Sequence, residues 1–337
     1  MESILGQAPA IELLRRMLAR RRIPHSLLFQ GPEGVGKATL ARALATELLC
    51  ERQEQNACGA CRSCRMTARA SHPDLLEIGF IPMKDRPNEL RKVIVVEQIR
   101  ELTHLAGLAP REGRYRIFII DPADRMNLES QNSLLKTLEE PPGRAVLMLV
   151  ASRQHLLLPT VRSRCIAVGL STLRTEELTR LLQQRGMAPE EAAARAALAS
   201  GRVGKALALD LEELRERRDE LVRMLETLAA GREALAKLPD MATAFSGKDE
   251  ATLLESLDLF QGLLRDAVRT GAGGDRSTLV HADLAKRVAE LGDRLGPARA
   301  AALVQGADRV RGYLRFNTNR TLIAEGLLAA VAGGPLP

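Results

Sequence analysis

The stretch GPEGVGK, residues 31–37, constrains the fold more than any other part of the chain. It follows the apolar run HSLLFQ at residues 25–30 and precedes leucines spaced four residues apart, at positions 40, 44 and 48. A strand, a glycine-rich turn and a helix in that order form the setting of a phosphate-binding loop. The sequence therefore predicts an α/β domain with a nucleotide cradle. The residues expected to line the cradle are Gly31, Pro32, Glu33, Gly34, Val35, Gly36, Lys37, Ala38 and Thr39.

The cradle lacks two groups that hydrolysis requires. In the pattern G-x-x-x-x-G-K-[ST] the last hydroxyl ligates Mg²⁺, and here that position is Ala38. Thr39 does not replace it, because one helical step turns a side chain by about 100°. The strand RIFIID ends in Asp121, which suits contact with the metal, but Pro122 follows where an active enzyme has a glutamate. We expect a cradle that admits ATP or ADP at most, without intrinsic hydrolysis, and only a minor rescue by Asp124.

Strand-length and helix-length patterns alternate only in the first half of the chain. Besides residues 25–30, apolar runs of strand length occur at 75–78, 116–121, 145–151 and, more briefly, 165–168. Helical spacing occurs between them, and this alternation predicts a parallel sheet with helices on both faces. After residue 169 every pattern is helical. We therefore expect an α/β domain at 1–168, a small helical domain at 169–212 and a larger helical domain at 213–337.

Four cysteines lie within fifteen positions and predict a metal site. Cys50, Cys58, Cys61 and Cys64 follow the spacing C-x7-C-x2-C-x2-C. Four thiolates at such spacing can surround Zn²⁺ as a tetrahedron, and a site with four protein ligands leaves no position for a reacting water. The expected role is structural. His72 and Cys165 are expected outside the ligand set, the histidine as a hydrogen-bonding or capping residue and the cysteine as a buried one.

Composition limits the classes of protein to consider. The net charge of +7 permits an acidic or nucleic-acid partner, while an aromatic content of 2% argues against binding of single strands by base stacking. No apolar run approaches the roughly 20 residues of a membrane span, and no signal peptide is visible, so we expect a cytoplasmic protein without membrane contact. Arg62, Arg65 and Arg69 surround the cysteines and leave open a zinc-dependent DNA-binding protein as the least favoured interpretation.

Several motifs together resemble one family. GPEGVGK, the cysteine insert, HPD at 72–74, RIFIID, NSLLKTLEEPP at 132–142, SRC at 163–165 and FNTNRTLIAEGLL at 316–328 follow the order found in the clamp-loader branch of the AAA+ ATPases. The resemblance spans essentially the whole chain. It implies a RecA-like AAA+ domain that carries the zinc module, then a helical lid domain and a helical collar domain.

The resemblance also implies partners and a role. Such subunits form a ring of five that opens a sliding clamp and places it on primed DNA, here with motor subunits (gamma/tau) and a delta subunit of bacterial DNA polymerase III. The arginine of SRC, Arg164, would act in trans on the ATP site of a neighbouring motor. Ala38, Pro122 and Gly204, which stands where motors carry a lid arginine, favour a non-hydrolysing stator. An active motor of the same fold is the alternative.

Overall fold

The computed structural model describes residues 4, 6–52, 57–82, 91–271, 279–314 and 318–335. The chain divides into two compact units, Met1–Ala208 and Leu209–Pro337. The helices predicted to form a small separate domain belong to the first unit up to Ala208, and the three-domain division remains a prediction. Within the described part of the chain, no helix combines the length and the apolar character that crossing a membrane requires.

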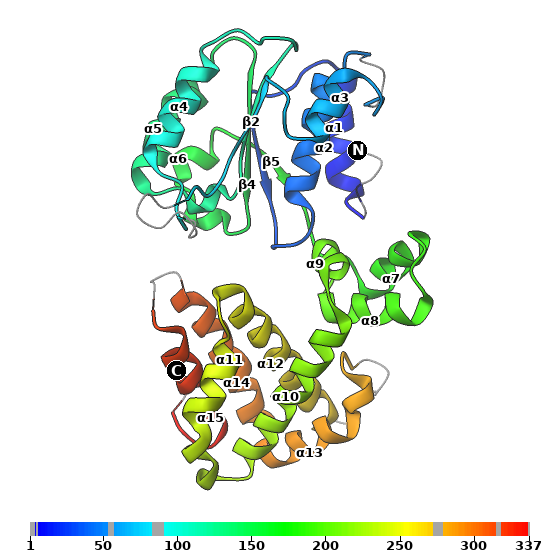
Figure 1. Ribbon diagram of the computed structural model, residues 1–337, viewed down its shortest axis with the longest axis vertical. Coiled ribbons are helices and arrows are strands. Elements are labelled where there is room, and N and C mark those ends of the chain that lie inside the picture. Colours follow the sequence, from blue (N-terminus) through cyan, green and yellow to red (C-terminus); the bar gives the residue numbers. More distant parts are fainter. Residues whose placement is uncertain are drawn as a thin grey trace. The chain divides into compact units, whose positions relative to one another are not determined.

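A five-stranded sheet organises the first unit (Figure 1). Its strand order is β2-β3-β4-β1-β5, and every neighbouring pair is parallel, as the sequence predicted. Parallel strands end at one common edge of a sheet, and ligands of open α/β sheets bind beyond that edge. The strands are β1 (Ser26–Gln30), β2 (Leu75–Ile78), β3 (Arg116–Ile120), β4 (Ala145–Ala151) and β5 (Ile166–Gly169).

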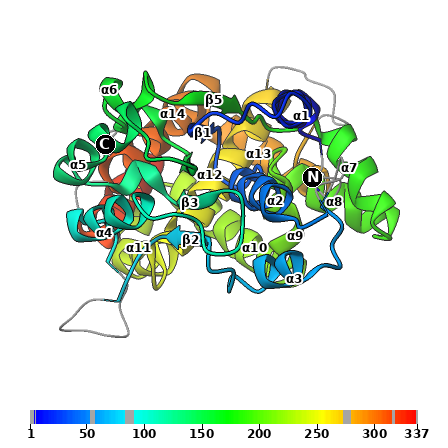
Figure 2. The same ribbon diagram turned by 90° about the horizontal axis from the view of Figure 1, so that it is seen from above.

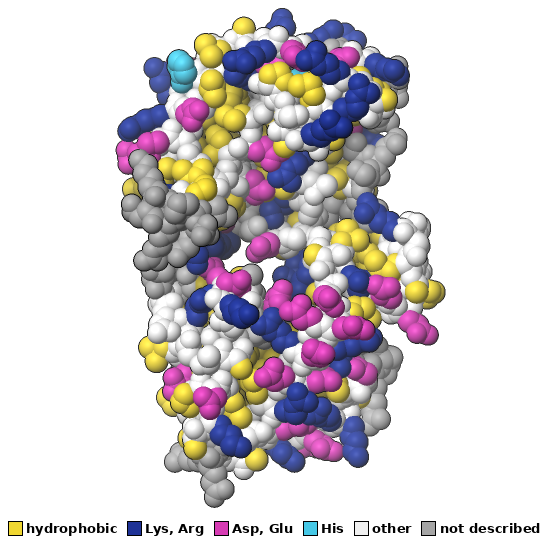
Figure 3. All heavy atoms as spheres, in the orientation of Figure 1, with side chains coloured by type: hydrophobic (Ala, Val, Ile, Leu, Met, Phe, Trp, Pro, Cys, Tyr) yellow, Lys and Arg dark blue, Asp and Glu magenta, His cyan; other side chains and the backbone are white. Residues whose placement is uncertain are grey.

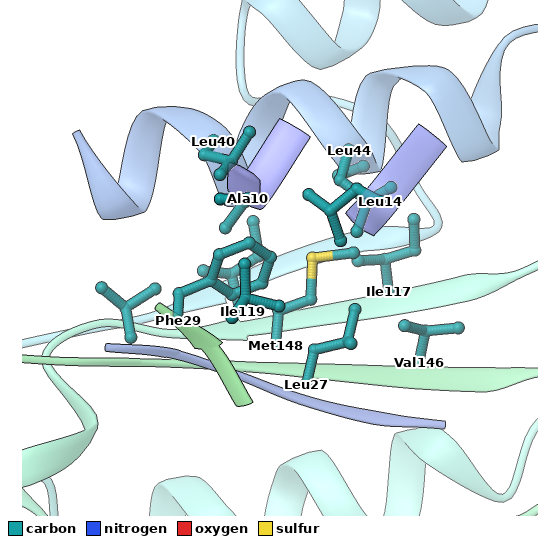
Figure 4. Packing of buried hydrophobic residues seen from close by; sticks show 14 of the residues in the cluster. Ala10, Leu14, Leu27, Phe29, Leu40, Leu44, Ile117, Ile119, Val146 and Met148 are labelled. Atoms are coloured by element: carbon teal, nitrogen blue, oxygen red, sulfur yellow. The ribbon is translucent and has the colours of Figure 1, made fainter. Parts of the chain in front are cut away.

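Helices cover both faces of the sheet (Figures 1 and 2). Helices α1 (Ala8–Ala19) and α2 (Lys37–Leu49) cover one face, and α4 (Val96–Ala106) and α5 (Leu128–Glu139) cover the other. All seven residues of β4 are buried, because successive side chains of a strand point to opposite faces and both faces are covered. Figure 4 shows Val146 and Met148 of β4 packed with Leu27 and Phe29 of β1 beneath α1 and α2.

The remaining helices of the first unit are short. A helix that the sequence patterns did not predict, α3 (Arg62–Ala68), lies in the cysteine segment, and α6 (Pro159–Arg162) precedes β5. Pro159 is suited to the first helical position because that position needs no backbone donor. Three further helices follow the sheet: α7 (Thr175–Gln184), α8 (Pro189–Ala199) and α9 (Val203–Ala208).

The second unit is helical throughout its described residues, as predicted. Helix α12 is central, and α13 and α14 pack against it. Asp210 and Asn319 cap α10 and α15 by accepting backbone N–H bonds. Phe316 and Asn317 of the FNTN motif lie outside the described residues. The named helices are α10 (Leu211–Ala229), α11 (Leu238–Ser246), α12 (Glu250–Gly271), α13 (Ala285–Leu295), α14 (Pro297–Tyr313) and α15 (Arg320–Val331).

Asp74, of the HPD motif, holds the loop that precedes β3. Its carboxylate is 1% exposed and accepts backbone N–H bonds from Arg111, Glu112 and Gly113 at 2.6, 2.8 and 2.7 Å. Burial by itself would raise the pKa of Asp74, but these three N–H groups outweigh it and lower the pKa. The carboxylate of Asp74 thus provides the hydrogen-bond acceptors for three backbone N–H groups of this loop.

Replacing Asp74 with alanine should free this loop. Three backbone N–H groups would lose a charged acceptor, and we expect a loss of about 3 kcal/mol in the stability of the first unit. Hydrogen exchange at residues 111–113 should accelerate by at least about tenfold, while Asp74→Asn, which keeps an acceptor oxygen, should show a smaller change. Unchanged exchange in the alanine variant would contradict this role.

Candidate functional site

The predicted cradle forms at the carboxyl edge of the sheet, between β1 and α2. Gly36 has a φ of +97° and ends the loop directly before Lys37, the first residue of α2. Gly31 approaches the backbone so closely that a Cβ there would lie 2.1 Å from the carbonyl oxygen of Leu170. Both positions therefore require glycine. The loop thus leads directly into the amino terminus of α2, where backbone N–H groups have no partner within the helix.

Lys37 makes contacts within the chain instead of standing free for a phosphate. The side chain is 6% exposed, and its Nζ donates to the carbonyl of Pro32 at 2.7 Å and to Oγ of Ser152 at 2.9 Å. Burial lowers the pKa of Lys37, although Glu33, Asp124 and Asp121 oppose the shift. A nucleotide would have to displace these two acceptors before the ammonium could reach its phosphates.

The metal side of the site is also altered. Ala38, which has no hydroxyl, packs against the hydrophobic core, and Thr39 is exposed to solvent. Burial raises the pKa of Asp121, with the positive charges of Arg42 and Lys37 in opposition. Arg42 itself forms hydrogen bonds of 2.8 to 3.0 Å with both carboxylate oxygens of Glu77. The positive charge near Asp121 thus comes from the chain's own guanidinium and ammonium groups.

Asp124 is occupied with a structural task. It is buried, accepts a hydrogen bond from the backbone N–H of Ser152 at 3.1 Å and pairs with Arg153 at 3.5 Å. A carboxylate held in this way ties the 3₁₀ turn Ala123–Arg125 to the end of β4. Its engagement weighs against the minor rescue that the sequence left open.

The helix α9 lies directly against the loop. The backbone N–H of Gly204 donates to the carbonyl of Gly34 at 2.7 Å, and a Cβ on Gly204 would lie 3.0 Å from that oxygen. This is the position at which motor subunits were expected to carry an arginine. Arg202, the nearest candidate, donates from Nε to the carbonyl of Ala199 at 3.2 Å. A larger residue at position 204 would crowd the contact between α9 and the loop.

The four predicted cysteines come together. Their sulfur atoms all lie within 4.8 Å of one another, and a tetrahedral Zn–S site needs sulfurs about 3.8 Å apart. Backbone N–H groups point at the sulfurs: Cys61 N–H donates to Cys58 Sγ, and Cys64 N–H donates to Cys61 Sγ, both at 3.3 Å. Such bonds orient and stabilise thiolates. The cluster can hold one metal ion.

The pKa values of the thiols differ sharply across the cluster. Backbone N–H groups of Ala60 and Cys61 lower the pKa of Cys58 to about 6, while burial raises the pKa of Cys64 to about 12. A buried thiol of that kind becomes a thiolate when a cation replaces its proton. The donor set therefore fits a soft divalent metal.

Polar side chains next to the cysteines form hydrogen bonds with Ser63 in the same segment. Glu51 accepts hydrogen bonds from the N–H and Oγ of Ser63 at 2.9 and 3.1 Å, at the start of α3. His72 Nε2 lies 3.3 Å from Ser63 Oγ, and its Nδ1 accepts the N–H of Asp74 at 3.1 Å. His72 is thus a hydrogen-bonding residue, as predicted.

The three residues of the SRC motif make different contacts. Arg164 Nη2 lies 2.5 Å from Oε1 of Glu139, and its Nη1 donates to the carbonyl of Thr160 at 2.9 Å. Ser163 Oγ also donates to Thr160, at 3.2 Å. Cys165 packs against the core on the α4 and α5 face, where burial raises its pKa to about 12. The side chain of Arg164 is 34% exposed, and its guanidinium contacts both Glu139 and Thr160.

Arg164 does not belong to the cradle of its own chain. Ile166 pairs with Leu27 near the start of β1, whereas the loop begins after Gln30, where β1 ends. These levels differ by about 13 Å along the strand. Arg164 also contacts α5, on the face of the sheet opposite to α2.

The sequence analysis missed two residues and one backbone contact of the site. Ser152 is a polar residue directly after the apolar strand β4, a signal that was available. Glu139 belongs to the motif LLKTLEEPP, but nothing in the sequence pairs it with Arg164. The bond between Gly204 and Gly34 joins backbone atoms 170 positions apart, which no side-chain pattern reveals.

Comparisons with known proteins agree over both units. Residues 6–174 match the family described as DNA polymerase III, delta subunit, and residues 212–332 match its C-terminal family. DNA polymerase III subunit delta' of Pseudomonas aeruginosa is 32% identical over 94% of this chain and 94% of its own. The delta' subunit of Escherichia coli is 28% identical over 96% of this chain and 93% of its own.

A tau subunit matches only part of the chain. The tau subunit of Escherichia coli is 34% identical over 181 residues, which are 53% of this chain and 27% of that protein. The similarity to delta' subunits instead runs through the helical second unit as well. The chain therefore belongs to the delta' family of DNA polymerase III subunits.

Proposed function

We propose that this chain is a non-motor subunit of a DNA polymerase III clamp loader, a stator that supplies Arg164 in trans to the ATP site of a neighbouring motor. The observation that carries the proposal is that Lys37 bonds to Pro32 and Ser152 within its own chain, beside a loop whose Gly34 carbonyl accepts the N–H of Gly204. The residues present do not fit a Mg²⁺-bound nucleotide, because the hydroxyl at position 38 and the catalytic glutamate are replaced by Ala38 and Pro122.

The assembly that we propose follows from the family. The partners are motor subunits (gamma/tau) and a delta subunit in a ring of five, together with the sliding clamp and, through the ring, primed DNA in the cytoplasm. Within this subunit, residues 1–168 form the AAA+ domain, 169–212 the lid and 213–337 the collar. The bond between Gly204 and Gly34 supports a lid whose position on the loop does not depend on nucleotide.

The geometry of Arg164 supports action on another chain. A guanidinium has five N–H donors, and two of them are used by Glu139 and Thr160, so three remain for the phosphate of a neighbour. A fixed fork loses less entropy when it meets the transferred phosphoryl group, and its charge stabilises the transition state. We propose Glu139 as the positioning residue for this arginine.

The cysteine cluster is proposed to hold structural Zn²⁺. Bound zinc would supply a cross-link between the end of α2, where Cys50 lies, and the start of α3, where Cys61 lies. All four ligands come from the chain, so the ion has no open position for a substrate.

The first test is nucleotide turnover by the isolated full chain. With Mg²⁺ and ATP, hydrolysis should stay at the buffer background, and Lys37→Ala should leave this value unchanged, because the lysine serves the loop and not a phosphate. Equilibrium binding of a fluorescent ATP analogue, measured in parallel, separates an inert binder from a bare scaffold. Steady hydrolysis that Lys37→Ala abolishes would establish the motor alternative.

A double-mutant cycle in the reconstituted loader tests Arg164 and Glu139. Arg164→Ala should lower DNA-stimulated ATP turnover by roughly threefold to tenfold, since only one motor site loses its arginine. Glu139→Ala should lower turnover less, and Glu139→Gln, which keeps an acceptor oxygen, should lie in between. In the Arg164→Ala background Glu139→Ala should add nothing, because it acts through the arginine.

Assembly measured by size exclusion controls this cycle. Unchanged turnover in an assembled Arg164→Ala loader would remove the trans role. A full effect of Glu139→Ala in the Arg164→Ala background would instead show that the carboxylate only stabilises the fold.

Metal content tests the zinc site. Elemental analysis of the purified chain should find about one zinc per molecule, and Cys61→Ser or Cys64→Ser should lose it. Cys165→Ser is the matched control, because this thiol packs against a separate core and should leave zinc in place. Removal of zinc by a chelator should open the segment 50–69 to protease. A zinc-free wild-type protein with a stable segment would refute the assignment.

A further inference from the structure

The surplus positive charge of the chain lies entirely in its first unit. Residues 1–208 contain 31 Lys and Arg against 22 Asp and Glu, a net charge of +9, whereas residues 209–337 contain 18 against 20, a net charge of −2. Figure 3 shows Lys and Arg side chains gathered at the end of the first unit that is remote from the α7–α9 helices. That end carries the amino termini of the parallel strands.

Seven exposed arginines make up this surface, which we call the amino-edge rim. Four of them precede strands of the sheet, two lie on or before the loop that Asp74 holds, and one ends α3. The rim consists of Arg20, Arg21, Arg22, Arg69, Arg111, Arg114 and Arg144.

Hydrogen bonds in the backbone connect the segments of the rim. The N–H of Arg116, two residues after Arg114, donates to the carbonyl of Arg144 at 3.0 Å. The carbonyl of His25, three residues after Arg22, accepts the N–H of Leu147 at 2.7 Å. Arg62 of α3 pairs with Glu112, beside Arg111, at 3.3 Å. The seven residues therefore belong to one continuous edge.

The rim arginines differ from the paired arginines of this unit, although other exposed arginines, such as Arg15 and Arg174, also make no side-chain bond among the described residues. Among the described residues, no ion pair or side-chain hydrogen bond engages any of the seven. By contrast, Arg42, Arg100 and Arg164 each pair with a glutamate. The nearby acids are already used, since Glu112 pairs with Arg62 and Asp74 is buried on three N–H groups.

Unneutralised like charges weaken a fold through mutual repulsion, so this arrangement does not serve stability. It suits a partner that brings negative charge. Guanidinium groups bind phosphates through two parallel N–H bonds, which favours a phosphate backbone over isolated carboxylates. The scarcity of aromatic residues, 2% of the chain, disfavours stacking on single strands.

We propose that the amino-edge rim binds the phosphate backbone of duplex DNA without sequence preference. The duplex would meet the rim's own arginines, independently of the cradle and of Arg164. This mode differs from that of a zinc finger, because no helix needs to enter a groove.

The test uses the isolated, zinc-loaded full chain and a fluorescein-labelled duplex of arbitrary sequence, with binding followed by anisotropy over a series of salt concentrations. The triple variant Arg22→Gln, Arg114→Gln, Arg144→Gln should weaken binding at low salt by at least about tenfold. It should also reduce the slope of log K against log salt by about 2.7, which is about 0.9 for each phosphate that the variant no longer neutralises.

A matched triple variant controls for net charge. Arg174→Gln, Arg180→Gln and Arg185→Gln remove the same charge from exposed positions on and beside α7, which follows the opposite edge of the sheet. They should change affinity by less than about twofold. An equal reduction of affinity in both variants would reduce the effect to net charge and overturn the proposal.

Two other outcomes would also overturn it. The wild-type chain could fail to bind the duplex at low salt, or it could bind polyglutamate through the rim and not DNA, which would indicate an acidic protein partner. None of these measurements needs neighbouring subunits, so a negative result leaves the trans role of Arg164 standing. A negative result in the reconstituted loader likewise leaves the rim untouched.

Discussion

The burial of a parallel sheet on both faces is the constraint on which the first unit depends. Every residue of β4 is inaccessible to solvent, and the strands on either side of it share the same direction. Because all strands end at one edge, the chain must place its loop, Asp121 and Ser152 together beyond that edge. The segments that lead into the strands lie at the opposite edge, and these segments carry arginines of the rim. Two chemically distinct surfaces thus arise from one sheet.

At the carboxyl edge, the loop that was expected to bind a nucleotide makes hydrogen bonds with other segments of its own chain. The loop keeps its glycine backbone and its lysine, but Lys37 holds Pro32 and Ser152, and Gly34 holds Gly204. The bonds to Pro32 and Ser152 occupy the ammonium that would otherwise face phosphate, and the bond to Gly204 fixes the backbone of the loop. Ala38 and Pro122 remove the hydroxyl and the acid that hydrolysis needs. Backbone and ammonium hydrogen bonds fasten this loop in a chain of the delta' family.

The arginines of the first unit differ in how many of their N–H donors the protein itself uses. Arg42 and Arg100 are paired with glutamates. Arg164 is held by Glu139 and Thr160 but keeps three of its five donors. The rim arginines have no partner among the described residues. In the cysteine cluster, the four sulfur atoms lie close together, and backbone N–H groups donate to them.

The sequence by itself determined the parallel sheet, the helical remainder, the glycine loop, the clustering of four cysteines and the proline that follows Asp121. These follow from local spacing and residue type, which act over a few positions. Only the tertiary structure decided what Lys37, Asp124, Gly204 and Glu139 contact. It also decided that arginines from four separate segments lie along one edge. Such contacts join residues far apart in the chain, and the packing of the sheet, not any pattern along the sequence, brings them together.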